Sequence, residues 1–180
     1  MSTYEYTKYC TTKEHLKETI ENYGVAIIPS VIDSSECDQM LNGMWDYFEQ
    51  ITKDWAAPIQ RQNRDSWKEI YKFYPKHSML FQHYSVGHAQ VVWNLRQNEK
   101  ILDIFSTLWN CKPEDLLASF DGLSFNMPPE TTNRGWNHNR TWYHTDQSYT
   151  RNNLECIQSW VTALDVHDGD ATLAFLEGSN

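Results

Sequence analysis

The spacing of apolar residues changes near Lys112, and this change most constrains the fold. Before it, apolar side chains recur at three- and four-residue steps, the spacing of one face of an α-helix. After it, apolar residues occur in short runs separated by Asp-Gly and Pro-Pro pairs, which is typical of β-strands. The sequence therefore predicts a helical support over residues 1–112 and the first strands of a β-structure over residues 113–180.

Three segments of the first part have helical patterns. Residues 13–22 predict a short helix that stops before Gly24, and residues 97–109 predict a longer one. Between them, Asp33 and Glu36 have capping-box spacing, with Asp33 as the expected N-cap. The apolar residues that follow this cap at helical spacing are Cys37, Met40, Leu41, Met44, Phe48 and Ile51.

Two stretches of the first part have no helical spacing. Residues 25–28 predict a buried strand that is closed by Pro29. Residues 54–84 are rich in polar and aromatic side chains and keep no sustained period. We expect loops with short helical turns there.

The second part contains five strand candidates. They are residues 116–120, 123–126, 142–147, 157–166 and 172–176. Helices followed by short strands suggest an α+β, mainly β protein, a β-barrel or jelly roll with a helical support. Because no linker, repeat or low-complexity tract divides the chain, we expect a single domain over residues 1–180.

His144 and Asp146 are the candidate metal ligands. On an extended strand, residues two apart point to the same side, so an imidazole nitrogen and a carboxylate oxygen lie together. Such a pair supplies two of the three ligands of a facial iron site. The alternative is a histidine hydrogen-bonded to its neighbours, with Asp146 solvated or capping a turn.

Several segments around this pair carry ordered motifs. They are residues 23–29, 35–37, 123–129, 142–147, 158–165 and 169–179. Together they resemble the phytanoyl-CoA dioxygenase (PhyH) family, iron(II)- and 2-oxoglutarate-dependent oxygenases that fold as a double-stranded β-helix. The resemblance extends from about Tyr23 to Asn180.

The resemblance implies a cupin-like double-stranded β-helix, in which His144 and Asp146 bind Fe(II) and 2-oxoglutarate is the cosubstrate. The implied reaction is hydroxylation of a small or lipid-like organic substrate, and the carboxylate of Asp146 favours it over halogenation. No catalytic residue beyond the metal ligands is implied. Trp160 and Asn126 would contact the cosubstrate; the alternatives are a core aromatic for Trp160 and a strand-end hydrogen bond for Asn126.

The resemblance also places a distal histidine ligand and an arginine that binds 2-oxoglutarate beyond Asn180. His167 lies only about two strands after His144, and we expect it in a surface loop. We therefore expect a truncated chain in which the C-terminal part of the barrel is missing. A missing segment or a homo-oligomer would complete it, and activity of the chain alone is left open.

Two other function classes stay open. One is a non-catalytic β-helix remnant that binds a ligand or partner. The other is a zinc-binding, hydrolase-like cupin, for which no third His or Glu stands at convincing spacing.

Charge and composition limit the partners. A net charge of -9 argues against a nucleic-acid-binding surface. The cysteines are scattered without a C-x-x-C pair, and this pattern indicates reduced thiols. No signal-peptide pattern and no apolar run of about 20 residues occurs. We expect a cytoplasmic protein without a membrane span, whose partner is a small-molecule organic substrate.

Overall fold

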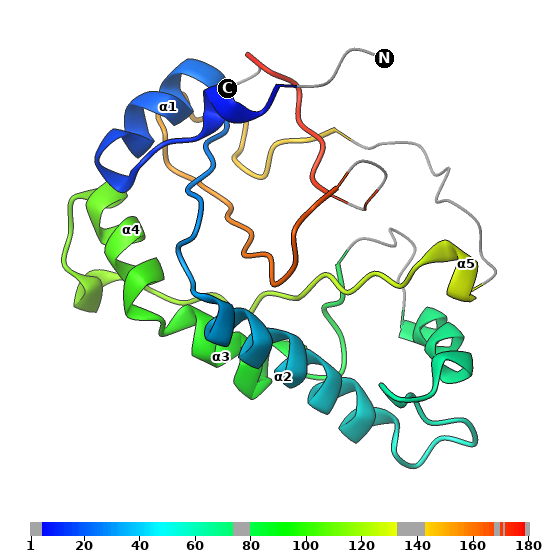
Figure 1. The fold of residues 1–180 in the computed structure, drawn as a ribbon. Helices are drawn as coiled ribbons and strands as arrows, with labels where there is room; N and C mark the ends of the chain where they lie inside the picture. Colours follow the sequence, from blue (N-terminus) through cyan, green and yellow to red (C-terminus); the bar gives the residue numbers. More distant parts are fainter. Residues whose placement is uncertain (1–4, 74–79, 133–142, 168–169, 171, 179–180) are drawn as a thin grey trace.

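The chain folds as helices joined by irregular segments (Figure 1). The computed structural model describes residues 5–73, 80–132, 143–167, 170 and 172–178, and every structural statement below concerns these residues. In Figure 1 the helices follow an arc around the outside, and the orange-to-red chain after residue 143 runs inside that arc. Within the described ranges, no helix combines the length and apolar character needed to cross a bilayer.

The first α-helix ends where the sequence predicts. After two 3-10 turns, η1 (Thr7–Tyr9) and η2 (Lys13–His15), helix α1 covers Leu16–Tyr23. Gly24 follows in the left-handed conformation, with φ of 75°, and its N–H donates to the carbonyl of Ile20 over 2.7 Å. Glycine adopts this conformation at little steric cost, so the helix stops here.

Helix α2 (Ser34–Thr52) begins at the predicted capping box. The Glu36 N–H donates to Asp33 Oδ1 over 3.0 Å, and the Asp33 N–H donates to Glu36 Oε2 over 2.7 Å. An N-cap of this kind contributes about 1 kcal/mol to helix stability. On the predicted apolar face, Met44 and Phe48 are buried.

Helix α4 (Glu99–Trp109) confirms the helix expected over residues 97–109. Its N-cap is Asn98, whose Oδ1 accepts from the Lys100 N–H over 2.9 Å. Asn98 Nδ2 also donates to Glu36 Oε1 over 2.8 Å, and Lys100 Nζ donates to Glu36 Oε2 over 2.6 Å. Glu36 therefore joins the start of α4 to the start of α2.

Helix α3 (Gln90–Arg96) is a helix that the sequence pattern does not predict. Its buried residues Val91 and Val92 are β-branched, which gives them a weak intrinsic preference for helix. They pack with Met44 of α2, and a Cβ atom at Gly43 would lie only 2.8 Å from Val91 Cβ. Close packing on α2 therefore stabilises a helix that the local sequence favours weakly.

The remaining elements are short. They are η3 (Arg64–Phe73), η4 (Val86–His88), η5 (Pro113–Asp115) and α5 (Pro129–Thr132). Element η3 agrees with the short helical turns expected over residues 54–84. Helix α5 follows the strand candidate of residues 123–126, in a stretch for which the sequence pattern predicts no helix.

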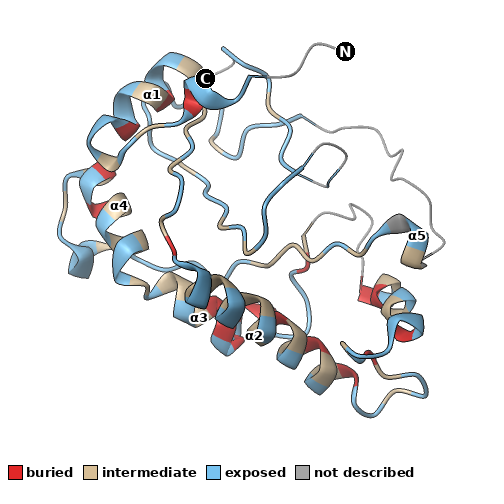
Figure 2. Cartoon of the chain, in the orientation of Figure 1, coloured by how far each residue is buried: buried red, intermediate tan, exposed pale blue. Residues whose placement is uncertain are grey.

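The hydrophobic core forms where α2, η3 and the segment around Phe81 meet. Its main cluster contains Phe48, Ile59, Ile70, Phe73, Phe81 and Val86. Figure 2 shows buried residues along the helices and at η3, whereas the chain after residue 143 is mostly exposed. Among the described residues, none after Leu108 is buried.

The predicted mainly β fold, a double-stranded β-helix or jelly roll, is wrong for the described residues. They form helices and no β-strand. Two isolated β-bridges occur in this part of the chain, Cys10 with Ile27 and Phe81 with Leu123. The first bridge is all that forms of the strand predicted over residues 25–28.

Of the other predicted strands, the one over residues 123–126 forms only the bridge at Leu123. The rest are irregular as far as the structure describes them, and the first residue of the segment 142–147 lies outside the description. A strand is stable when a neighbour takes its backbone hydrogen bonds and a packed layer covers one face. Here the apolar side chains of Leu117 and Leu164 are 98% and 65% exposed.

The turn η1 binds the C-terminal segment. The hydroxyl of Tyr9, a residue only 1% exposed, donates to Glu177 Oε2 over 2.5 Å, and Lys8 Nζ donates to both oxygens of Glu177 over 2.9 Å. These hydrogen bonds hold the pKa of Glu177 below its ordinary value, and the bond from Tyr9 has the largest effect. The Phe175 ring packs edge-on against Tyr9 with centroids 5.5 Å apart. Residues 8 and 9 thus fix the position of residues 175 and 177.

Candidate functional site

The predicted metal ligands lie side by side. His144 Nε2 is 3.3 Å from Asp146 Oδ1, and their side chains are 47% and 40% exposed. The backbone there is irregular at His144 and bends at Asp146, so the strand expected for this pair is not formed in the described residues. The proximity of the two groups is confirmed, while the backbone expected to produce it is not.

The geometry of the pair fits two neighbouring ligands of a divalent metal. Bonds of about 2.1 Å at a right angle place two ligand atoms about 3.0 Å apart. The observed 3.3 Å between nitrogen and oxygen needs only a small adjustment to meet this value. Imidazole nitrogen and carboxylate oxygen are also the donor types of non-haem Fe(II) sites. No third His, Cys, Asp or Glu joins them within the described part of the chain.

Gln158 binds the second oxygen of the Asp146 carboxylate, because its Nε2 donates to Asp146 Oδ2. The two carboxylate oxygens therefore have different surroundings: Oδ1 is next to His144, and Oδ2 accepts from an amide. Sequence reasoning placed Gln158 only inside a motif of the family resemblance. The contact joins residues 12 positions apart, and no local pattern predicts it.

Gln147 closes the loop between Asp146 and Gln158. Its Nε2 donates to the carbonyl of Arg151 over 3.2 Å and to that of Asn153 over 2.7 Å. Its Oε1 accepts from the N–H of Glu155 over 3.0 Å. This one amide thus holds three points of the loop backbone and returns the chain toward Asp146, a role that sequence reasoning also missed.

Trp160 and Asn126 are the two candidate cosubstrate residues. The Trp160 side chain is 45% exposed. Asn126 Nδ2 donates to Ser124 Oγ over 3.0 Å, next to Phe125, whose ring packs on the core. Their contact with 2-oxoglutarate stays a prediction.

His167 is exposed, as expected. Its N–H donates to Asp170 Oδ2 over 2.8 Å, and the Asp170 N–H donates to the His167 carbonyl over 3.0 Å. These two hydrogen bonds join residues 167 and 170 without using the imidazole.

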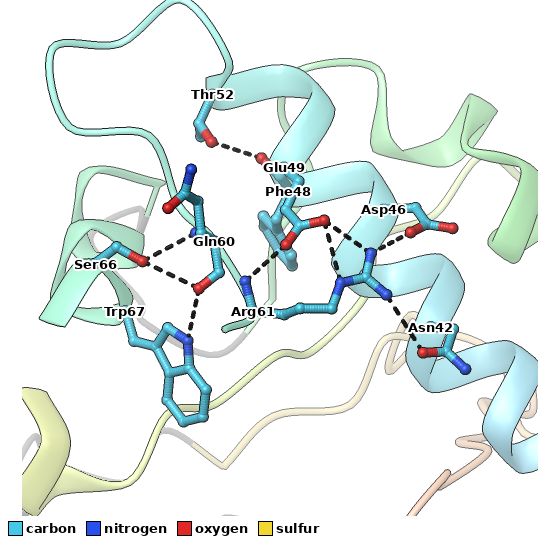
Figure 3. Close-up of polar contacts among 9 residues, drawn as sticks. All are labelled: Asn42, Asp46, Phe48, Glu49, Thr52, Gln60, Arg61, Ser66 and Trp67. Atoms are coloured by element: carbon cyan, nitrogen blue, oxygen red, sulfur yellow. Dashed lines mark hydrogen bonds and ion pairs between the residues drawn. The ribbon is translucent and has the colours of Figure 1, made fainter. Parts of the chain in front are cut away.

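A second polar cluster, around Arg61, serves the fold (Figure 3). Arg61 donates from its backbone N–H to Glu49 Oε1 over 2.7 Å, and from Nε and Nη2 to Glu49 Oε2 over 3.1 and 2.9 Å. The guanidinium also contacts Asp46 and Asn42, both on α2. The side-chain hydrogen bonds of Arg61 hold the pKa of Glu49 below its ordinary value. Because these groups satisfy one another, the cluster attaches the loop that follows α2 to that helix.

Comparison with known proteins adds one relative. The chain is similar to the Ava biosynthesis cluster protein O of Aspergillus versicolor, with 29% identity over 97 residues. The match covers 54% of this chain and 30% of that protein, so it spans less than a third of the relative's length. No protein-family model matches the chain. No solved structure matches it significantly.

Proposed function

We propose that this chain contributes two metal ligands to an Fe(II)- and 2-oxoglutarate-dependent oxygenase that hydroxylates a small or lipid-like organic substrate. The observation that supports the proposal most directly is the 3.3 Å distance between His144 Nε2 and Asp146 Oδ1. The resemblance of the surrounding motifs to the phytanoyl-CoA dioxygenase family supplies the identity of the metal and cosubstrate.

The residues of the chain bind and orient in this proposal. His144 Nε2 and Asp146 Oδ1 would hold Fe(II), and both are exposed enough for a metal ion to reach them. Bound Fe(II) with 2-oxoglutarate supplies the oxidising power for hydroxylation of a C–H bond by O₂. The indole N–H of Trp160 and the amide of Asn126 would donate hydrogen bonds to the cosubstrate, since N–H donors suit its carboxylates.

The name of the relative, Ava biosynthesis cluster protein O, refers to biosynthesis, which is compatible with a small-molecule substrate. The agreement concerns the substrate class alone, because the match covers 30% of that protein.

Anaerobic titration tests the proposal. Fe(II) added with 2-oxoglutarate should produce the weak metal-to-ligand charge-transfer band of such complexes in the wild-type chain. The band should be lost in His144→Ala and kept in His15→Ala, a histidine with a 71% exposed side chain in η2. Equal bands in wild type and His144→Ala, or no band at millimolar 2-oxoglutarate, contradict the proposal.

A second candidate is a non-catalytic module that binds a ligand or partner. It is favoured by large apolar side chains that face solvent, of which Leu117, Phe120 and Leu176 are 98%, 63% and 66% exposed. Exposed apolar patches of this kind are typical of interaction surfaces. A wild-type chain that binds a fluorescent apolar probe, loses it in Leu117→Ser and gives no charge-transfer band supports this candidate over the oxygenase.

A further inference from the structure

We infer that Gln158 is a positioning residue for the metal ligand Asp146, and that Gln147 shapes the loop that brings Gln158 to it. The inference rests on the proposed metal site and says how the chain prepares that site. Its basis is the set of hydrogen bonds around the Asp146 carboxylate and along the loop of residues 147–158.

The first step concerns the Asp146 carboxylate itself. Its Oδ2 accepts a hydrogen bond from Gln158 Nε2, while Oδ1 lies 3.3 Å from His144 Nε2. An oxygen held by an amide donor is less available to a metal, so the carboxylate presents Oδ1 toward the histidine nitrogen. Fixing the rotation of the carboxylate in advance also lowers the entropy lost when a metal binds.

The second step concerns the choice of an amide. A glutamine N–H is a neutral donor that cannot bind a cation through its nitrogen. It therefore orients Asp146 without competing for the metal and without opposing the metal's positive charge. A lysine or arginine in its place would donate as well, but its positive charge would repel a divalent ion.

The third step concerns the loop. Both N–H groups of the Gln147 amide are used, on the carbonyls of Arg151 and Asn153, and its oxygen accepts from the Glu155 N–H. Holding these three points reduces the conformations open to the loop and so lowers the entropy cost of bringing Gln158 back to Asp146. The ion pair between Arg151 and Glu155 adds little, because both side chains are substantially exposed.

Titration with Co(II), followed by visible absorption, tests the inference without any turnover. Gln158→Met keeps the length of the side chain and removes its donors, and Gln39→Met is the matched control at an exposed glutamine of α2. Loss of a hydrogen-bond partner of a metal ligand weakens metal affinity by about 10–100-fold. We expect that loss, with a changed absorption band, in Gln158→Met, and wild-type behaviour in Gln39→Met. Gln147→Ala should also weaken Co(II) binding and speed proteolysis within residues 148–155.

A double-mutant cycle separates positioning from general structure. If Gln158 acts through Asp146, then Gln158→Met should have no further effect on Co(II) affinity in an Asp146→Ala background. An equal loss in both backgrounds overturns the inference, as do an unchanged affinity and spectrum in Gln158→Met. If Co(II) binding is lost in His144→Ala but unchanged in Gln158→Met, the inference about Gln158 is overturned and the proposed metal site stands. A wild-type chain that does not bind Co(II) overturns the proposed metal site and this inference with it.

Discussion

Replacing Thr52 by valine tests what joins helix α2 to the loop that follows it. The Thr52 side chain is fully buried, and its Oγ1 has two partners. It donates to the carbonyl of Phe48 over 2.8 Å and accepts from the N–H of Ile59 over 3.0 Å. The first of these bonds is drawn in Figure 3. Valine has nearly the same shape and a similar helix preference, so the change removes two hydrogen bonds with little effect on packing.

Most of the cost arises at the amide of Ile59. A carbonyl inside a helix also has a backbone partner, whereas the Ile59 N–H loses the acceptor that the structure gives it. A buried N–H without an acceptor costs about 1–3 kcal/mol. We therefore expect Thr52→Val to lower the free energy of unfolding by about 2 kcal/mol, a large fraction of the stability of a typical domain.

Thr52→Ser is the matched control. Serine keeps the hydroxyl and loses one methyl group, for which about 0.8 kcal/mol of hydrophobic stabilisation is expected. The reasoning therefore predicts that valine destabilises more than serine, although valine preserves more of the apolar contact. A pure packing account predicts the opposite order.

Urea denaturation of the three proteins measures these differences. Hydrogen exchange at the Ile59 amide gives a local measure, and it should be faster in Thr52→Val than in Thr52→Ser. If Thr52→Val is as stable as wild type, or if serine is the more damaging change, then the Thr52 hydroxyl is not what satisfies the Ile59 amide.

Three further predictions concern other contacts. In Gly43→Ala the new Cβ would lie 2.8 Å from Val91 Cβ, so α2 and α3 must move apart. The thermal midpoint of unfolding should therefore fall, although alanine has the better helix propensity. A rise in the midpoint would show that the two helices have room for the methyl group. Hydrogen bonds, of which the one from Lys100 has the largest effect, lower the pKa of Glu36 to about 2. The ionised carboxylate therefore stabilises the fold at pH values above the ordinary pKa of glutamate, and this contribution is lost as the pH falls toward 2. Acid denaturation should depend less on pH in Lys100→Met, and equal slopes would contradict this account. Burial raises the pKa of Tyr47 to about 12. Ultraviolet titrations of wild type and Tyr47→Phe should therefore differ only near that pH, and a difference near pH 10, where ordinary tyrosines ionise, would refute the assignment.

The predictable part of the fold is the part that depends on neighbouring residues. Gly24 ends α1 through its own backbone conformation, and Asp33 with Glu36 caps α2 through side chains three positions apart. Helix α3 depends instead on Gly43 and Met44 of α2, which lie far from it in sequence. No window of local sequence contains that information, so the pattern does not predict this helix.

The strand predictions after Lys112 show the same dependence in the opposite direction. Short apolar runs between Asp-Gly and Pro-Pro pairs indicate that a segment can enter a sheet, but a sheet also needs a partner strand and a layer to cover it. Leu117 and Leu164 belong to two such apolar runs, yet their side chains face solvent. The apolar runs are present in the sequence, but without partner strands they form no sheet, so the predicted strands are wrong for the described residues.

The candidate site also has a part that local sequence predicts and a part that it does not. Residues two apart lie close on a strand and can also lie close across a bend, so the proximity of His144 and Asp146 did not depend on the backbone that was expected. Gln158 reaches Asp146 only because Gln147 closes the intervening loop. That contact requires the three-dimensional path of the chain and could not be predicted from spacing.

The attachment of Glu177 to Lys8 and Tyr9 has a consequence for a nicked form of this protein. A protease that cuts within residues 148–155 leaves two fragments, and the smaller one still carries Glu177 and Phe175. Hydrogen bonds and ring packing to Tyr9, together with the contact of Ile157 on the cluster formed by α1 and α4, would hold that fragment in place. The two fragments should therefore migrate together under native conditions and separate only in denaturant, as a complex assembled from one chain.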